Sequence, residues 1–180
     1  DDPRAILRVS KGTDFQGLLA ARREAVSAAG EDEAAVARAE GAFRRLVSAA
    51  EERFKEEAQK EGSDAEAHFQ YGNFLQTTEL FAEAEEEYIK ALEKDQAHVD
   101  AMNNLATLRL EVDDDAQGAQ FLWRQALDNA PEDIDVMFNL ARAARALGEE
   151  AEVDARVEEI LKLRPEMADN DVLTAFRETA

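Results

Sequence analysis

The sequence has no cysteine, only three prolines, and no apolar run as long as a membrane span. Without cysteine, the chain can form neither a disulfide framework nor a thiolate metal site. A membrane-spanning helix needs about 18 or more consecutive apolar residues, and no segment approaches that length. No signal-peptide pattern is present, and the first residue is Asp1, which predicts an excised domain or a processed form. We expect a soluble chain of unknown compartment, with an intracellular location favoured.

Basic residues are also scarce, because 21 Lys and Arg face 41 Asp and Glu, and the net charge is −20. Nucleic acids and anionic membrane surfaces require a basic face, so neither is an expected partner. The negative charge favours a neutral to basic protein partner if it serves binding, and a surface that is simply kept solvated is the alternative interpretation. The apolar fraction of 45% is high enough for a folded core.

No residues have the spacing of a catalytic or metal site. His68 and His98 have no second ligand at metal spacing. The acidic turn that starts at Asp113 is similar to the beginning of a calcium loop, but its twelfth position is Arg124, where a bidentate glutamate is needed. There is no nucleophile elbow, catalytic triad or phosphate-binding glycine loop. We predict a protein that is not an enzyme and that needs no metal or cofactor.

What the sequence does contain is a repeat of 34 to 35 residues between Ala65 and Pro165. Small residues recur with gaps of twelve or thirteen and then seven residues, and two larger residues replace them in the third unit. This series is Gly72, Ala84, Ala91, Ala106, Ala119, Ala126, Ala141, Val153 and Ile160. Tyr88 and Trp123 keep the same register and are predicted to be core residues. The pattern predicts two short antiparallel helices per unit that touch at the small residues.

The repeat resembles the tetratricopeptide repeat family, whose period is 34 residues. The resemblance covers Ala65 to Pro165, and it departs from the family where His68 replaces a tryptophan and Gln96 replaces a proline. It implies an all-α, right-handed superhelical solenoid of helix hairpins. It also implies a concave groove that binds a segment of another protein.

We predict four segments along the chain. Residues 1–12 are irregular or extended, and residues 13–62 form N-terminal helices at about 14–29 and 32–60. Residues 63–165 form three units (65–98, 99–133 and 134–165), and residues 166–180 form a C-terminal capping helix. The long helix at 32–60 either caps the exposed end of the solenoid or projects its first half to dock elsewhere.

The resemblance also implies which side chains face the groove. They lie on the first helix of each unit: Phe69, Gln70, Asn73, Asn103, Asn104, Thr107, Phe138, Asn139, Arg142 and Arg145. An asparagine amide both donates and accepts hydrogen bonds, so Asn73, Asn104 and Asn139 are expected to hold an extended backbone. Phe69 and Phe138 are expected to be apolar anchors at the two ends. Arg142 and Arg145 are expected to accept an acidic or polar residue.

The predicted function is non-catalytic peptide binding, and the alternative is a constitutive subunit of a larger assembly. The bound segment is expected to be extended, with an amphipathic helix as the second possibility. Chaperone-binding members of the family hold an acidic C-terminal tail with cationic residues. This sequence has Phe69, Asp135 and Asn139 at those places, so an acidic chaperone tail is not the expected partner.

Overall fold

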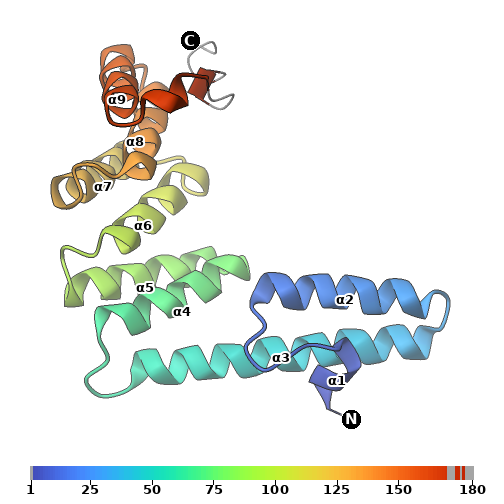
Figure 1. The fold of residues 1–180 in the computed structure, drawn as a ribbon. Helices are drawn as coiled ribbons and strands as arrows, with labels where there is room; N and C mark the ends of the chain where they lie inside the picture. The colour runs from blue at the N-terminus through green and yellow to red at the C-terminus, as the bar shows by residue number, and fades with distance from the viewer. Residues whose placement is uncertain (1, 170–172, 175, 177–180) are drawn as a thin grey trace.

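The computed structural model describes residues 2–169, 173, 174 and 176, and its helices from α3 onward stack in chain order (Figure 1). All regular structure in this part of the chain is helical, as predicted. The elements are α1 (Pro3–Leu7), α2 (Phe15–Ala29), α3 (Glu33–Gln59), α4 (Ala65–Thr77), α5 (Phe81–Lys94), α6 (Val99–Glu111), α7 (Ala116–Asn129), α8 (Ile134–Ala146), α9 (Glu150–Leu163) and the 3₁₀ helix η1 (Pro165–Asp169).

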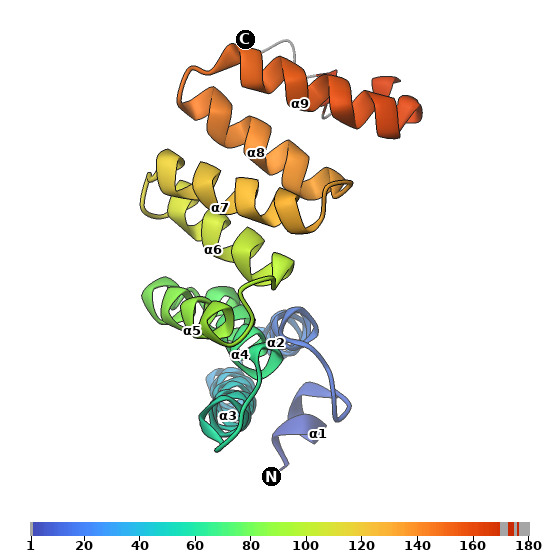
Figure 2. The ribbon, with the colours of Figure 1, turned by 90° about the vertical axis from the view of Figure 1, so that its left-hand side faces the viewer.

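Three antiparallel hairpins, α4–α5, α6–α7 and α8–α9, form the solenoid (Figure 2). Each hairpin packs on the next, because α5 contacts α6 and α7 contacts α8. The C-terminal half of α3 packs on α4 and so takes the place of the second helix of a preceding hairpin. The predicted solenoid of helix hairpins is confirmed.

The helices approach most closely where the repeat places small residues. A Cβ atom on Gly72 would lie 2.7 Å from Cε1 of Tyr88, so only glycine fits there without movement. The alanines of the series have no exposed surface: Ala84, Ala91, Ala106, Ala119, Ala126 and Ala141. Tyr88 and Trp123 are also fully buried, which confirms their prediction as core residues.

The turn inside each hairpin contains one residue in the left-handed backbone region. These residues are Glu79, Asp114 and Gly148, with φ angles of 64°, 55° and 73°. A left-handed residue reverses the chain after a helix, and glycine is the residue that adopts it without steric cost. The first two turns therefore carry backbone strain that the third avoids.

The expectation of an irregular or extended segment at residues 1–12 is wrong for Pro3–Leu7, which forms α1. Asp2 caps this helix by accepting a hydrogen bond from the backbone N–H of Arg4 at 2.9 Å, and Pro3 suits the first turn. A short apolar run fits a strand or one helical turn equally well, so packing decides between them. Here Leu7 is buried against α2 and α3.

The long helix α3 belongs to two apolar clusters. Its first half packs with α1 and α2 through Ala39, Ala42 and Leu46. Its second half joins the first hairpin, where the ring of Phe54 lies 5.4 Å from the ring of Phe74 on α4. The first half of α3 is therefore covered on one side by helices of its own chain.

The C-terminal end of the solenoid is covered by residues after α9. The helix expected over 166–180 begins instead with the 3₁₀ helix η1, and residues 170–172, 175 and 177–180 of that prediction lie outside the described residues. Leu173 is 2% exposed and packs against Met137, Val157 and Ile160. A buried leucine at this place shields the apolar end of α8–α9.

Candidate binding face

A row of amide side chains crosses the three hairpins on α4, α6 and α8. Asn104 Nδ2 donates to Asn73 Oδ1 at 2.7 Å, and Asn139 Nδ2 donates to Asn103 Oδ1 at 3.0 Å. Asn103 Nδ2 lies 3.5 Å from Asn104 Oδ1, and this contact joins the Asn73–Asn104 pair to the Asn103–Asn139 pair. We call these four residues the asparagine ladder. It brings together four asparagines that were all predicted to face the groove, three of which were expected to hold an extended backbone.

Two buried aromatic residues of the second helices hold the ladder in place. The hydroxyl of Tyr88 lies 2.8 Å from Asn73 Oδ1 and 2.6 Å from Gln76 Oε1. Trp123 Nε1 donates to Asn103 Oδ1 at 2.8 Å. Burial raises the pKa of Tyr88 to about 12, so its hydroxyl keeps its proton at physiological pH. The buried rings of Tyr88 and Trp123 thus fix the orientation of the side-chain amides of Asn73 and Asn103.

The ladder keeps some hydrogen-bonding capacity for a ligand. Asn73 Oδ1 and Asn103 Oδ1 each have two hydrogen-bonding partners, which fills an amide oxygen. Asn73 Nδ2, in contrast, donates to none of the described residues. All four ladder residues are half-buried. The face can therefore offer N–H donors from a preset position.

The arginines at the third hairpin are already engaged. Arg142 donates to Asn139 Oδ1 at 3.1 Å and to Glu111 Oε1 at 2.7 Å, so it extends the ladder to the end of α6. The guanidinium of Arg145 lies 3.8 Å from the centre of the Phe176 ring and donates to the backbone oxygen of Phe176. An acidic residue of a partner would have to compete with these contacts.

The two phenylalanines predicted as anchors do not face an open groove. Phe69 is 9% exposed and belongs to the core, with its ring 6.0 Å from Tyr88 and 4.9 Å from His98. Phe138 is half-buried, and the ring of Phe176 lies 5.0 Å from it. His98, which caps α6, lies over the ring of Phe69, so the role of Phe69 as an anchor remains a prediction that would require His98 to move.

Gln70 and Thr107, the remaining predicted face residues, differ in how easily their side chains can turn towards a ligand. Gln70 is exposed, and its side-chain amide donates to Glu66 one turn earlier. Thr107 is half-buried and donates to the backbone oxygen of Asn103 at 2.9 Å. Gln70 can turn towards a ligand at little cost, whereas Thr107 mainly satisfies its own helix.

A serine, a histidine and a glutamate that the sequence analysis did not connect lie together beside α4. Ser63 Oγ is 3.2 Å from His68 Nε2, and His68 Nδ1 is 2.7 Å from Glu87 Oε2. This is the order of groups in a hydrolase triad. The shallow depression beside Ser63 is lined by Asp64, Glu66 and Asp95, together with Lys94 and His98. Three carboxylates beside Ser63 would destabilise the negatively charged oxyanion that forms in acyl transfer. The hydrogen bond between His68 and Glu87 connects α4 to α5.

The described residues lack the features of two other kinds of site. Within them, no group of three or more His, Cys, Asp or Glu side chains is placed to hold a metal ion. None of the described helices combines the length and the apolar character needed to cross a bilayer.

Neither the family models nor the curated protein sequences include a match to this chain. Solved structures do match. The first repeat domain of Spaghetti (RPAP3), bound to the HSP90 peptide SRMEEVD, has 19% identity and a TM-score of 0.59 over 64% of this chain and 89% of that one. MamA has 16% identity and a TM-score of 0.60 over 88% and 87% of the two chains. YrrB, a repeat protein with an unusual peptide-binding site, has 13% identity and a TM-score of 0.60 over 92% and 83%.

The fold is that of the tetratricopeptide repeat proteins. The tetratricopeptide fold explains why the ladder exists, since it brings the first helices of successive hairpins side by side. In this chain His68 stands where the family has a tryptophan, and its contacts with Ser63 and Glu87 replace apolar packing with hydrogen bonds.

Sequence reasoning missed the polar atoms of Tyr88 and Trp123, which it treated only as apolar bulk. A signal was available, because a buried tyrosine hydroxyl or indole N–H needs a hydrogen-bonding partner. The preceding first helices offer amides for this purpose, and the partners in the structure are Asn73 and Gln76 for Tyr88 and Asn103 for Trp123.

Proposed function

We propose that the chain binds an extended segment of another protein along the face formed by α4, α6 and α8. The asparagine ladder would hold the backbone of that segment. The observation that carries the proposal is the continuous hydrogen-bonded row from Asn73 to Asn139, whose amides are oriented by Tyr88 and Trp123. RPAP3 and YrrB, which share the fold, are peptide-binding proteins, and this supports the same class of function.

Binding along the ladder exchanges hydrogen bonds as well as adding them. The free N–H groups of Asn73 can donate to a backbone carbonyl without any rearrangement. Asn104 or Asn139 can turn from its neighbour to a peptide group and back. Because every peptide unit offers one donor and one acceptor, this recognition does not depend on the side chains of the segment. Specificity must then come from the ends of the face.

The partner segment is expected to be neutral to basic over the middle of the face. The chain has a net charge of −20, and Arg142 already pairs with Glu111. An acidic tail like the peptide bound by RPAP3 would meet Asp135 and would find no free guanidinium at Arg142. Long-range attraction instead favours association with a basic segment, and this attraction weakens as salt increases.

The proposal is tested by selecting displayed peptides on the full chain and measuring the affinity of a selected peptide for variants. Asn104→Ala removes the central donor of the ladder and should weaken binding about fivefold, which corresponds to one ordinary hydrogen bond of about 1 kcal/mol. Asn129→Ala is the matched control, since Asn129 is an exposed asparagine of α7 away from the ladder. If both variants bind as the parent does, the ladder is not the site.

A constitutive assembly subunit is the second candidate, and one observation favours it. Phe121 on α7 is 62% exposed, and Ile89 on α5 is 38% exposed. Exposed aromatic and aliphatic side chains on the second helices are typical of a surface that a permanent partner covers. Light scattering of the protein purified from its source separates the two functions. Elution alone at 20.0 kDa argues against the assembly subunit.

A further inference from the structure

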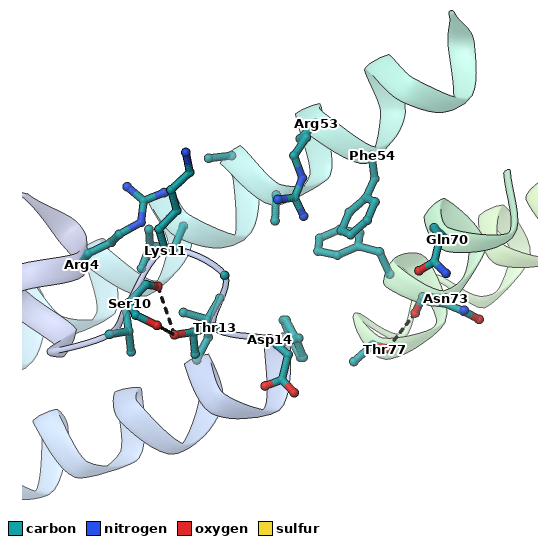
Figure 3. Close-up of a pocket in the computed structure, with 18 residues that line it drawn as sticks. Arg4, Ser10, Lys11, Thr13, Asp14, Arg53, Phe54, Gln70, Asn73 and Thr77 are labelled. Atoms are coloured by element: carbon teal, nitrogen blue, oxygen red, sulfur yellow. Dashed lines mark hydrogen bonds between the residues drawn. The ribbon is translucent and has the colours of Figure 1, made fainter. Parts of the chain in front are cut away.

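A cavity of about 530 Å³ lies where the N-terminal helices meet the first hairpin (Figure 3). Its walls come from α1, the linker between α1 and α2, the start of α2, the middle of α3, and α4. Apolar side chains line much of it: Val9, Phe15, Leu18, Leu46, Phe54 and Phe74. The volume falls within the range of about 300–1,000 Å³ in which proteins bind small ligands and side chains.

Three cations stand around this apolar cavity. Arg4 comes from α1, Lys11 from the linker and Arg53 from α3, where its guanidinium lies 4.6 Å from the centre of the Phe54 ring. All three are exposed, and none forms an ion pair with a described residue. Three cations that line one apolar cavity together create a local positive potential, which favours an anion from outside.

The one carboxylate in the cavity wall has another task. Asp14 accepts a hydrogen bond from the backbone N–H of Gly17 at 2.7 Å and so caps α2. Its charge is directed to the positive end of that helix. It therefore leaves Arg4, Lys11 and Arg53 free to act on a ligand.

The cavity adjoins the asparagine ladder. Gln70, Asn73 and Thr77 of α4 form one wall, and Asn73 is the first member of the ladder. Figure 3 shows these three side chains across the cavity from Arg4 and Lys11. A segment that runs along the ladder towards α4 would enter the cavity and meet the linker at its far side.

We propose that this cavity receives the carboxyl-terminal residue of the partner segment. The apolar side chain of that residue lies on Phe15, Phe54 and Phe74, and its terminal carboxylate is held by Arg53 and Lys11. A chain end fits better than an internal acidic residue, because only a carboxyl-terminal residue carries both an apolar side chain and a backbone carboxylate, which are the two groups that this lining can bind. The inference rests on the proposed function and adds to it the direction and the terminal chemistry of the ligand.

The test uses the ¹⁵N-labelled full chain and three synthetic probes. They are acetyl-Gly-Ser-Gly-Phe with a free carboxylate, the same peptide as its C-terminal amide, and acetyl-Gly-Ser-Gly-Ser with a free carboxylate. We expect the phenylalanine acid to shift the amide signals of residues 9–15, 50–54 and 70–77 at millimolar concentration. The amide and the serine peptide should each bind at least about fivefold more weakly, since each lacks one of the two contacts.

Charge variants then locate the carboxylate. Lys11→Gln and Arg53→Gln should remove the preference for the acid over the amide. Lys55→Gln is the matched control, because Lys55 is an exposed cation on α3 that does not line the cavity, and it should keep the preference. Equal binding of acid and amide by the parent chain, an unchanged preference in both cavity variants, or no shifts at all each overturns the inference.

These outcomes are distinct from failure of the proposed function. If acid and amide bind equally and Asn104→Ala still weakens the displayed peptide, the ladder is the site and the cavity is not. If Asn104→Ala has no effect while the probes shift the cavity signals, the cavity binds chain ends without the ladder, and the proposed extended mode of binding is wrong.

Discussion

The hydroxyl of Tyr88, on the second helix of the first hairpin, lies 2.8 Å from Oδ1 of Asn73 on the first helix. The rest of the Tyr88 ring is buried against Gly72 and Phe69. One side chain thus forms part of the core with its ring and orients the candidate binding face with its oxygen. Stability and the order of the ladder are therefore linked at this residue.

Removing that hydroxyl should affect both properties. Tyr88→Phe is expected to lower the free energy of unfolding by about 1 kcal/mol, because the single hydroxyl proton of Tyr88 donates to Asn73 or Gln76 and that acceptor loses its partner. Tyr71→Phe is the control, since Tyr71 is also buried but its hydroxyl bonds to no described residue. Urea denaturation of both variants measures the difference. Equal losses would mean that the Tyr88 hydroxyl contributes nothing specific.

The two tyrosines should titrate at unusually high pH. Burial raises the pKa of Tyr88 from 10.0 to about 12, and burial with nearby carboxylates raises that of Tyr71. The pKa of Tyr88 in the folded state lies above its value in the unfolded state. Its contribution to the free energy of unfolding is therefore complete below about pH 10 and is lost as the pH rises through about 12. Phenolate absorbance during an alkaline titration measures this. A tyrosine titrating at its ordinary pKa in the folded chain contradicts the expectation.

The contact between Gly72 and Tyr88 should not tolerate a methyl group. Gly72→Ala is expected to cost about 1–3 kcal/mol, because the added Cβ would lie 2.7 Å from the buried ring. Gly41→Ala on α3 is the opposite case, since no atom lies within 4 Å of its added Cβ. It should gain about 0.5–1 kcal/mol from helix propensity. Thermal unfolding followed by circular dichroism tests the two signs.

The left-handed turn residues allow a test of backbone strain alone. Gly148 has a φ of 73° and open space around its Cβ position, so Gly148→Ala should cost about 1 kcal/mol through the backbone only. Glu79 has a φ of 64° in the equivalent turn, so Glu79→Gly should be neutral or stabilising by up to about 1 kcal/mol. Chemical denaturation of the pair decides this. A loss on Glu79→Gly would mean that its side chain matters more than its backbone.

The repeat register predicted the hairpins because the spacing of small residues reports directly on where helices touch. Gly72 and Ala84 could be placed against neighbouring helices without any three-dimensional information. The register also indicated the side of α4 on which Phe69 lies. It could not indicate that His98, at the start of the next unit, would cover the ring.

Other features depended on segments that are distant in the sequence. The apolar run around Leu7 could form a strand or a helical turn until its contact with Leu18 and Leu46 was known. The cavity brings Arg4, Arg53 and Asn73 together from three helices, and no local pattern connects them. Local periodicity therefore predicts elements well, whereas sites built from several elements need the packing itself.

The saturated oxygens of Asn73 and Asn103 have a kinetic consequence. In the proposed binding mode, a backbone N–H of the ligand can reach either oxygen only by displacing an internal hydrogen bond, and the reverse exchange lets the ladder close again as the ligand leaves. The intermediate states lose little energy, because each broken bond has a replacement within reach. A partner held mainly by the ladder should therefore exchange rapidly, and long-lived complexes should require an additional anchor beyond the row of amides.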